Sequence, residues 1–506
     1  MGTNSIDDKY FMARNSAYNP YWLTRREIGF NRPVGSGNAL ARSLYCGMKP
    51  IASWDCEQAN SLPTGGVFNL EFSPEGSLLV AACEKKSIQI FDPLTHQRIY
   101  SVIGAHSDCV NCVKFLDGRM FATCSDDTTI ALWDVRNLKK KIRSLLGHSN
   151  WVKNIEFSVK DKLLVTSGLD GSIYTWDINS YTEFNLVYQR VFHASGLMRC
   201  RLSPDAKQMV MCTTGGLLVI IHDLNLTTLA QDLHGFKPNL YRLMQMSQQV
   251  IPIAAMYDHL FDLERKENRV EFVSDFPDGN DAEVVSALQI HPQGWCALSR
   301  NISHDDRSEW SCIHDIQPGE SITNKSCRDT SPSPPAPPRR PAPRRPKRVR
   351  NRPYRHLRPM TSITTQGDTP VLPSTSGQTP LRDLYDDEYK HFIRQNRDRL
   401  LYYIEETNEG KGFIKELCFS ADGRLVCSPF GRGMRLLALN EQCAELSHCV
   451  QDFKGPSRMV DVGQSLGFHH DLVVSSKFSP RHHSLVTGCL EGKIVWYEPY
   501  SGESCY

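Results

Sequence analysis

Two groups of polar residues in this 506-residue sequence could form a relay of hydrogen bonds from a carboxylate to an imidazole. The first group is His106, Thr123, Asp127 and Trp133, and the second is His148, Thr166, Asp170 and Trp176. An imidazole oriented by a carboxylate is an arrangement that general-base catalysis uses. The same four side chains can instead satisfy one another as a buried structural network. Because the group recurs along the chain, we interpret both copies as structural.

Cysteine and histidine pairs are the other candidates for chemistry. Cys109 and Cys112 have Cys-x-x-Cys spacing, but side chains three apart in a strand face opposite sides. The histidine pairs at 469–470 and 482–483 fall in expected loops and lack further ligands at zinc spacing. The sequence has no Gly-rich phosphate loop and no nucleophile elbow. We therefore predict no catalytic residue, no metal site and no cofactor.

The two polar groups lie in segments that repeat. Residues 104–134 align with residues 147–177 almost without gaps, and the histidines and tryptophans recur after 42 and 43 residues. This period, with Gly-His near one end and Trp-Asp at the other, is typical of WD40 blades. Strand-like runs at 110–115, 121–124 and 129–133 are separated by turn residues. We expect the polar groups to be positioned by antiparallel strands of propeller blades.

Weaker copies of the repeat extend in both directions. They begin near Phe68, His193, Leu288, Phe413 and His470, which gives seven units in total. Seven blades lie within the range that propellers use. The sequence therefore predicts an all-β fold, a single seven-bladed WD40 β-propeller with an N-terminal extension and two inserts.

The expected boundaries follow from where the repeat is interrupted. We assign residues 1–60 to an N-terminal extension and residues 61–233, 283–316 and 384–506 to the propeller. The two inserts are residues 234–282 and 317–383. A short helix over about 381–406 is expected to lead back to the ring. The second insert is rich in Pro and Arg. Prolines remove backbone donors and like charges repel, so we predict that this insert is disordered.

Composition restricts the partners. The net charge of +2 gives no strong field toward nucleic acid or membrane. No apolar run approaches the about 18 residues needed to span a bilayer, and the N-terminus lacks a secretory signal, so we expect an intracellular protein in the cytoplasm or nucleus. Residues 339–358 hold ten Lys or Arg and no acid. We interpret them as a solvated loop, with weak nucleic-acid contact or nuclear import as the alternative.

The segment Trp133-Asp134-Val135-Arg136 places an arginine just past a third strand, where its guanidinium can bind carboxylates or carbonyls of a partner. This Trp-Asp-x-Arg box resembles the signature of the WD-repeat substrate receptors of cullin-4 RING ubiquitin ligases. The segments 121–134, 147–156 and 414–420 are also similar to that family. The resemblance covers about residues 65–223 and 284–498.

The resemblance implies a non-catalytic receptor that docks on a three-propeller adaptor, the damage-specific DNA-binding protein large subunit, and brings an unknown protein substrate to the ligase. It implies Trp133, Asp134 and Arg136 as the adaptor-binding residues. In that family an N-terminal helical segment also inserts into the adaptor, and residues 37–48 are our candidate for it. The family often carries a second box, but Asn179 stands where its arginine is expected.

Two other classes of function remain open at this stage. One is a WD-repeat scaffold in an RNA- or chromatin-associated complex, which the Pro/Arg-rich insert would serve. Steep salt dependence of nucleic-acid binding would identify it. The other is an enzyme of unknown type, which would need a converging polar pocket that the sequence does not reveal.

Overall fold

The second repeat unit shows why this sequence forms blades. Apolar residues fill its strands β6 (Val110–Phe115), β7 (Met120–Ser125) and β8 (Ile130–Asp134), which pair antiparallel, and β9 (Arg143–Leu145) completes the sheet. In β6 Asn111 and Lys114 are half-buried and the other four residues are buried, and the register with β7 shifts between Val110 and Cys112. The computed structural model describes residues 24, 27–28, 36–179, 188–256, 270–277, 284–302, 305–317, 393, 396–406, 415–451 and 453–499.

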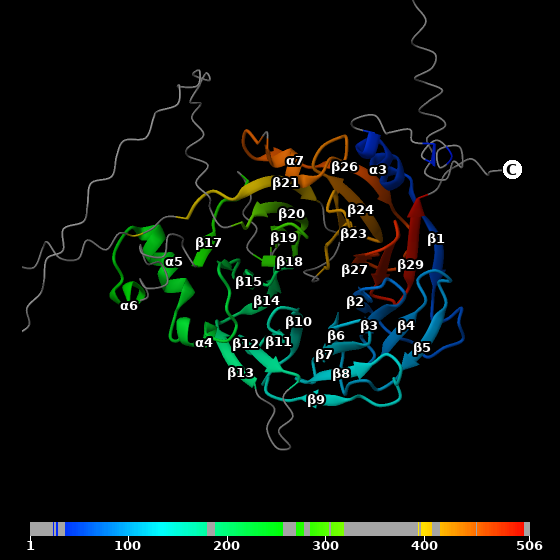
Figure 1. The fold of residues 1–506 in the computed structure, drawn as a ribbon, viewed down its shortest axis with the longest axis horizontal. Helices are drawn as coiled ribbons and strands as arrows, with labels where there is room; N and C mark the ends of the chain where they lie inside the picture. The colour runs from blue at the N-terminus through cyan, green and yellow to red at the C-terminus, as the bar shows by residue number, and fades with distance from the viewer. Residues whose placement is uncertain are drawn as a thin grey trace, which may run out of the picture. The chain divides into compact units, whose positions relative to one another are not determined.

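Seven such sheets form a ring, which confirms the predicted seven-bladed propeller (Figure 1). Blade 2 is the sheet β6–β9. Blade 1 contains β2 (Val67–Phe72), β3 (Leu79–Cys83), β4 (Ile88–Phe91) and β5 (Arg98–Val102). Blade 3 contains β10 (Val152–Ser158), β11 (Leu163–Gly168), β12 (Ser172–Asp177) and β13 (Tyr188–His193). Blade 4 contains β14 (Leu197–Leu202), β15 (Met209–Thr213), β16 (Leu218–Ile221) and β17 (Val270–Val273).

The remaining blades are less regular. Blade 5 contains β18 (Val284–Ile290), β19 (Trp295–Ile302), β20 (Asp305–Asp315) and β21 (Leu400–Glu406), and the short β25 (Ser457–Arg458) pairs parallel with β21. Blade 6 contains β22 (Cys418–Phe419), β23 (Leu425–Phe430), β24 (Gly433–Ala438) and β26 (Val460–Ser465). Blade 7 contains β27 (Val473–Phe478), β28 (Leu485–Cys489), β29 (Ile494–Pro499) and β1 (Met48–Trp54).

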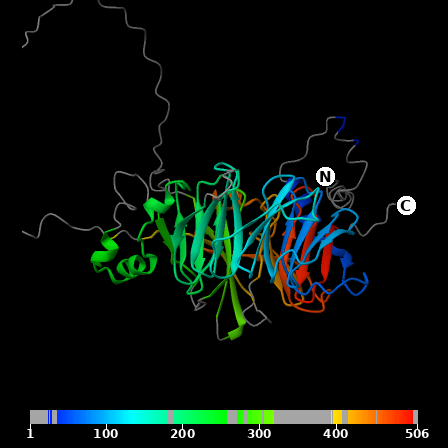
Figure 2. The ribbon, with the colours of Figure 1, turned by 90° about the horizontal axis from the view of Figure 1, so that it is seen from below.

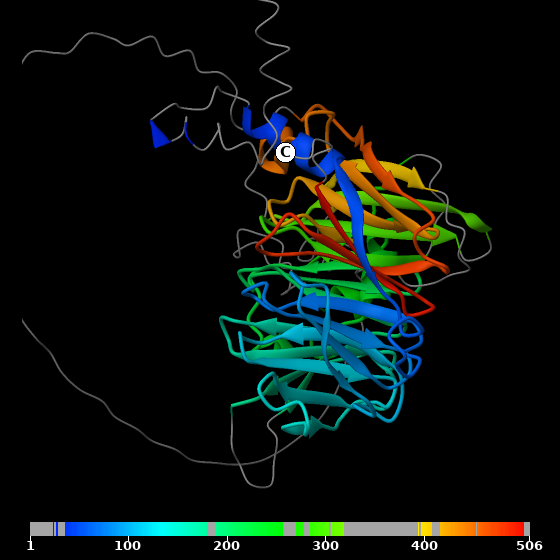
Figure 3. The ribbon, with the colours of Figure 1, turned by 90° about the vertical axis from the view of Figure 1, so that its right-hand side faces the viewer.

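The ring is closed by a strand from the N-terminal segment. β1 pairs antiparallel with β29, with Ala52 opposite Trp496 and Trp54 opposite Ile494. The prediction that residues 1–60 are an extension outside the propeller is therefore wrong for Met48–Trp54. The strand escaped prediction because it is separated from the rest of its blade by almost the whole chain. Directly before it lies α3 (Ser36–Cys46), at the edge of the ring in Figure 3.

Each blade is an up-and-down sheet, so its connections divide between two faces of the ring (Figure 2). Turns between first and second strands and connections between third and fourth strands lie on one face. We call it the Arg136 face, because Arg136 follows β8, the third strand of blade 2. Turns between second and third strands and the links between blades lie on the opposite face.

Both inserts separate the third from the fourth strand of a blade. The first follows β16 and includes α4 (Leu229–Asp232), α5 (Pro238–Ser247) and α6 (Pro252–Ala255). The predicted insert at 234–282 is too long, since Val270–Val273 form β17 and pair with β16. The second insert separates β20 from β21, and its residues from 318 to 392 lie outside the described part of the chain.

The short helix predicted over about 381–406 is wrong where the structure describes these residues. Leu400–Glu406 are extended and pair with β20, with mostly buried side chains that fit a fourth strand. α7 (Leu446–Gln451) lies instead in the connection between β24 and β26 of blade 6. Among the helices in the described ranges, none combines the length and the apolar character required to cross a membrane.

Candidate functional site

The structure brings together the first predicted polar group of blade 2. His106 Nδ1 lies 3.0 Å from Asp127 Oδ2, and its Nε2 lies 2.8 Å from Thr123 Oγ1. The Trp133 indole N–H donates to the same hydroxyl over 2.9 Å. Burial favours the neutral form of Asp127, but hydrogen bonds from His106, Thr129 and the Ser107 backbone hold its pKa below the ordinary value.

Blade 3 repeats this geometry. His148 Nδ1 lies 2.9 Å from Asp170 Oδ2 and Nε2 lies 2.8 Å from Thr166 Oγ1, to which the Trp176 indole donates over 2.8 Å. Burial lowers the pKa of His148. In both groups the polar atoms bond one another between buried strands, and both imidazole side chains are fully shielded from solvent. An external substrate therefore has no access to these imidazoles.

Blade 7 contains a partial copy that our sequence analysis missed. His469, interpreted above as a loop residue, is 2% exposed, and its Nε2 lies 2.7 Å from Thr487 Oγ1. Glu491 and Tyr497 occupy the places that Asp170 and Trp176 occupy in blade 3. Burial, Lys493 and His470 lower the pKa of His469 to about 3. The spacing of 18 residues between the histidine and the threonine, the same as in blade 3, was the available signal.

The predicted adaptor-binding residues separate into a buried and an exposed part. Trp133 is 3% exposed and belongs to the blade 2 network, so it cannot contact a partner directly. Asp134 Oδ1 accepts the Arg136 backbone N–H over 2.9 Å and lies 3.5 Å from its side-chain Nε. The Arg136 side chain is 62% exposed. Asp134 thus fixes the local backbone, and Arg136 presents a solvent-accessible guanidinium.

The corresponding position in blade 3 has the same backbone geometry without the charge. The Asn179 N–H donates to Asp177 Oδ1 over 2.9 Å, just as Arg136 does to Asp134. Both residues follow a third strand and lie on the Arg136 face. Blade 3 therefore has the shape of a second box but not its arginine.

Helix α3 also lies on the Arg136 face. Its Tyr45 packs edge-on against Phe478, the last residue of β27, and against His483 in the turn that follows, with ring centroids 6.1 and 5.6 Å away, respectively. Asn38 accepts a 2.6 Å hydrogen bond from Arg424, in the turn between β22 and β23. The helix is therefore attached to blades 6 and 7, while Arg42, Ser43 and Cys46 remain exposed.

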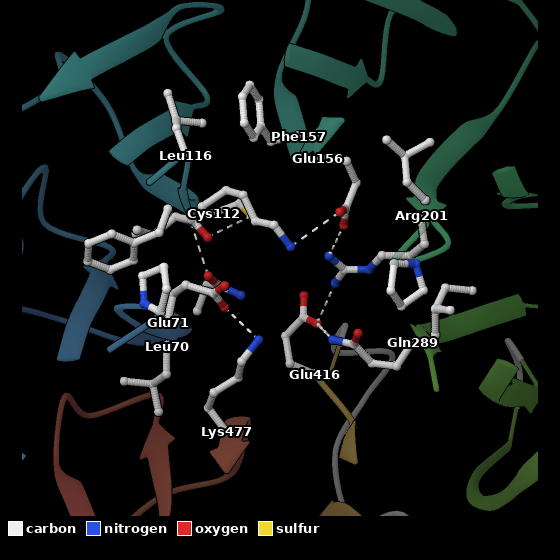
Figure 4. A pocket seen from close by; sticks show the side chains of 18 of the residues that line it. Leu70, Glu71, Cys112, Leu116, Glu156, Phe157, Arg201, Gln289, Glu416 and Lys477 are labelled. Carbon is white, nitrogen blue, oxygen red and sulfur yellow. Dashed lines mark hydrogen bonds and ion pairs between the residues drawn. The ribbon is translucent and has the colours of Figure 1, made fainter. Parts of the chain in front are cut away.

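A polar pocket of about 390 Å³, not expected from the sequence, lies at the mouth of the central channel on the Arg136 face (Figure 4). The innermost strands of most blades place a charged or polar residue there, directly before the apolar residue near the end of the strand. These residues are Glu71, Lys114, Glu156, Arg201, Gln289 and Lys477 in blades 1, 2, 3, 4, 5 and 7. Blade 6 contributes Glu416, which precedes its first strand.

The pocket residues alternate in charge and bond across blade boundaries. Glu71 lies 2.5 Å from Lys477, and Glu156 lies 3.3 Å from Lys114 and 2.7 Å from Arg201. Arg201 also reaches Glu416 at 3.0 Å. Burial alone would raise the pKa of Glu156, but Lys114 and Arg201 hold it below the ordinary value. The pocket is therefore a set of ion pairs that joins neighbouring blades.

The residues of this pocket do not form a recognisable catalytic centre of the kind that the enzyme hypothesis requires. Its carboxylates are bonded to cations, and the pocket contains no histidine and one cysteine, Cys112. Across the described ranges, no group of three or more His, Cys, Asp or Glu residues has the geometry to hold a metal ion. What the arrangement can do chemically is bind charged groups.

Comparison with known proteins identifies the repeat and the family. The family model described as WD domain, G-beta repeat matches residues 54–92, 97–134 and 139–177. DDB1- and CUL4-associated factor 10 of Danio rerio is 36% identical over 95% of this chain and 83% of its own length. The proteins of that name in Homo sapiens and Xenopus tropicalis are 35% and 34% identical, over 94% and 95% of this chain and 77% and 94% of their own lengths.

These alignments reach beyond residues 65–223 and 284–498, to which the sequence resemblance was confined. They place the chain within one member of the cullin-4-associated factors, the tenth, rather than among WD-repeat proteins in general. The chain belongs to the DDB1- and CUL4-associated factor 10 family.

Proposed function

We propose that this chain is the non-catalytic substrate-recognition subunit of a cullin-4 RING E3 ubiquitin-protein ligase, and that it docks on the adaptor DDB1 through Arg136. The names of its relatives associate those proteins with DDB1 and CUL4. The observation that carries the docking proposal is the exposed Arg136 guanidinium, held beside Asp134 at the edge of blade 2.

The chemistry of Arg136 suits a protein interface. A guanidinium presents several N–H donors in a fixed plane and can bind a carboxylate or two carbonyl groups at once. Its pairing with Asp134 is weak, because the Nε–Oδ1 distance is 3.5 Å and both groups contact solvent. Little free energy is therefore lost when a partner replaces that contact. Arginine is also among the residues that most often dominate interface energetics.

Helix α3 is our candidate for a second contact with the adaptor, and it supports the predicted role of residues 37–48. It lies on the same face as Arg136 and keeps Arg42 and Ser43 exposed, while Tyr45 anchors it to the ring. Two contacts on one rigid ring bind more tightly than either alone, since the second becomes intramolecular.

The proposed contribution to ubiquitination is positional. A receptor that holds its substrate beside the ligase raises the effective concentration of a substrate lysine without taking part in bond formation. Such a role needs a rigid scaffold and binding surfaces, which the seven blades supply. It places no demand on the buried histidine networks.

The test is the set of proteins that co-purifies with the full chain from cells. We expect DDB1 and cullin-4 with the wild-type chain and strong loss of both with Arg136→Ala. Arg432→Ala is the matched control, because Arg432 is exposed on the opposite face, in the turn between β23 and β24. Unchanged recovery of DDB1 with Arg136→Ala would refute the role of this arginine. Recovery of RNA- or chromatin-bound assemblies without DDB1 would favour a scaffold instead.

A further inference from the structure

The pocket at the channel mouth has unused hydrogen-bond donors but few unused acceptors. Glu156 accepts from Lys114 and Arg201, and Glu416 is contacted by Arg199, Arg201 and Gln289. Each of these carboxylates therefore already faces at least two donors. A ligand that enters the pocket gains little from donating to them.

The two lysines differ from these carboxylates. Lys114 and Lys477 each contact one carboxylate among the described residues, although an ammonium group has three N–H donors. Their side chains are 28% and 29% exposed, whereas Arg201 is 8% exposed. Both lysines therefore keep donors free toward the open side of the pocket.

The local charge also favours an acceptor. Blade 1 places Glu71 between the lysines of blades 7 and 2, and among the described residues Glu71 forms a direct ion pair with Lys477 alone. The charged side chains that line the pocket are three cations, Lys114, Arg201 and Lys477, and three carboxylates, Glu71, Glu156 and Glu416. Within this balanced set, the sector from blade 7 to blade 2 places two lysines beside one carboxylate, Glu71, in a partly enclosed site where an anion is held more strongly than in water.

The volume of the pocket and the apolar residues at its rim limit the size and type of anion that can bind. A volume of about 390 Å³ is at the lower end of the range for ligand sites, enough for one or two side chains. Apolar residues surround the charges, among them Leu116, Phe157, Val159 and Pro204. A rim of this kind can contact the chain on either side of an inserted side chain.

We propose that the channel mouth binds one acidic side chain of a peptide, a carboxylate or a phosphoryl group, between Lys114 and Lys477. This inference stands on the pocket alone and does not require that Arg136 binds DDB1. In a receptor, such a pocket would select partners that display an acidic or phosphorylated residue in an extended segment.

The test uses the full chain and three fluorescein-labelled peptides, with the sequences Gly-Ala-Glu-Glu-Ala-Gly, Gly-Ala-Ser-Glu-Ala-Gly with phosphoserine, and Gly-Ala-Lys-Lys-Ala-Gly. Fluorescence anisotropy at constant ionic strength is expected to show saturable binding of an acidic peptide and none of the lysine peptide. The phosphoserine arm against the glutamate arm shows which anion is preferred. Higher salt is expected to weaken the binding.

The variants assign the binding to the pocket. Lys114→Gln with Lys477→Gln is expected to weaken acidic-peptide binding at least tenfold, and Lys114→Arg with Lys477→Arg to keep it within threefold. The control Lys207→Gln removes a 72% exposed lysine from the same face, outside the pocket, and is expected to change affinity less than twofold. All variants keep residues 339–358, so any binding by that basic segment cancels.

Three results would overturn the proposal. They are no saturable binding of either acidic peptide, equally tight binding of the lysine peptide, or wild-type affinity in the Lys→Gln double variant. If that double variant does not fold, the single variants Lys114→Gln and Lys477→Gln take its place, and wild-type affinity in both would overturn the proposal. Arg136→Ala is expected to bind the acidic peptide as the wild type does, so failure of the pocket and failure of DDB1 docking are separate outcomes.

Discussion

At the scale of single residues, the imidazoles of blades 2, 3 and 7 hold loops to strands through a threonine hydroxyl. In blades 2 and 3 a carboxylate accepts from the other ring nitrogen, so both nitrogens are satisfied. In blade 7 the His469 Nδ1 atom is buried and has no hydrogen-bond partner among the described residues. A buried imidazole without a carboxylate strongly disfavours protonation.

This difference predicts a pH dependence of stability that depends on His469. Its folded pKa of about 3 lies below the unfolded value of about 6.5, so the unfolded chain binds the extra proton between these pH values. The stabilisation is complete above pH 6.5 and is lost as the pH falls toward the folded pKa. For one proton, the free energy of unfolding falls by about 1.4 kcal/mol per pH unit.

His469→Gln keeps a side chain that can bond Thr487 and removes the titration. Urea unfolding between pH 6 and pH 4 is expected to show a shallower loss of stability in this variant than in the wild type, by about 1.4 kcal/mol per pH unit. Equal slopes in the two proteins would show that His469 is accessible to protons in the folded state.

The residues that the sequence could identify are those that recur at the blade period. The two His–Asp–Thr–Trp groups and the Arg136 box each occur at a recognisable position, so their placement follows once the strands are assigned. The channel residues differ in type from blade to blade, from Glu71 to Lys114 to Glu156. They share only one sequence feature, a position directly before the apolar residue near the end of a first strand. Which of them form ion pairs depends on how the closed ring brings the blades together.

Asn179 offers a gain-of-function test, since its backbone already has the geometry of Arg136. Asn179→Arg adds a second guanidinium to the same face, at the neighbouring blade. We expect DDB1 to bind this variant about tenfold more tightly, equivalent to about 1.4 kcal/mol. Asn179→Gln is the control for side-chain length. Equal affinity of wild type and Asn179→Arg would place the edge of blade 3 outside the interface.

At the scale of elements, strands within an uninterrupted repeat could be assigned to their blades from the sequence, and strands that follow an insert could not. Strands with a strong local pattern, such as β6 and β10, were predictable because apolar residues and turn residues follow one another at short range. The residues of β17 have a strand-like sequence, but the assignment of β17 and β21 to their blades was not predictable, since each is separated from its third strand by an insert. β1 was assigned to an extension for the same reason. In each case the pairing partner, rather than the local sequence, determines the blade to which the strand belongs.

Truncation tests the closure by β1. A chain that begins at residue 36 keeps α3 and β1, and its melting temperature is expected to stay within about 2 °C of the wild type. A chain that begins at residue 55 exposes the edge of β29 and uncovers the buried Trp496, and we expect a loss of at least about 10 °C. Circular dichroism during heating measures both. Equal melting temperatures would show that the ring does not depend on β1.

At the scale of the whole molecule, ion pairs across the channel join blades that share no sheet. Arg201 of blade 4 bonds Glu156 of blade 3 and Glu416 of blade 6. Burial disfavours the charged form of Arg201, but these carboxylates raise its pKa above the ordinary value. The ring therefore depends on contacts that no single blade contains.

Removing Glu416 from this set leaves the buried Arg199 without its ion-pair partner among the described residues and leaves Arg201 with Glu156 alone. Glu416→Gln is expected to lower the free energy of unfolding by about 3 kcal/mol, because Arg199 and Arg201 lose their shared anion. Asp205→Asn is the control, since its pair with Lys207 is exposed, and a change below about 0.5 kcal/mol is expected. Urea denaturation measures both. Similar stability of the two variants would mean that the channel pairs are effectively solvated.

The central claim is that Arg136 on this propeller face binds DDB1, and the most direct measurement is the affinity of purified DDB1 for the purified full chain. Biolayer interferometry is expected to show at least about 30-fold weaker binding for Arg136→Ala, equivalent to about 2 kcal/mol, with Arg432→Ala unchanged. Equal affinities for the wild type and Arg136→Ala, with both chains folded, would contradict the account.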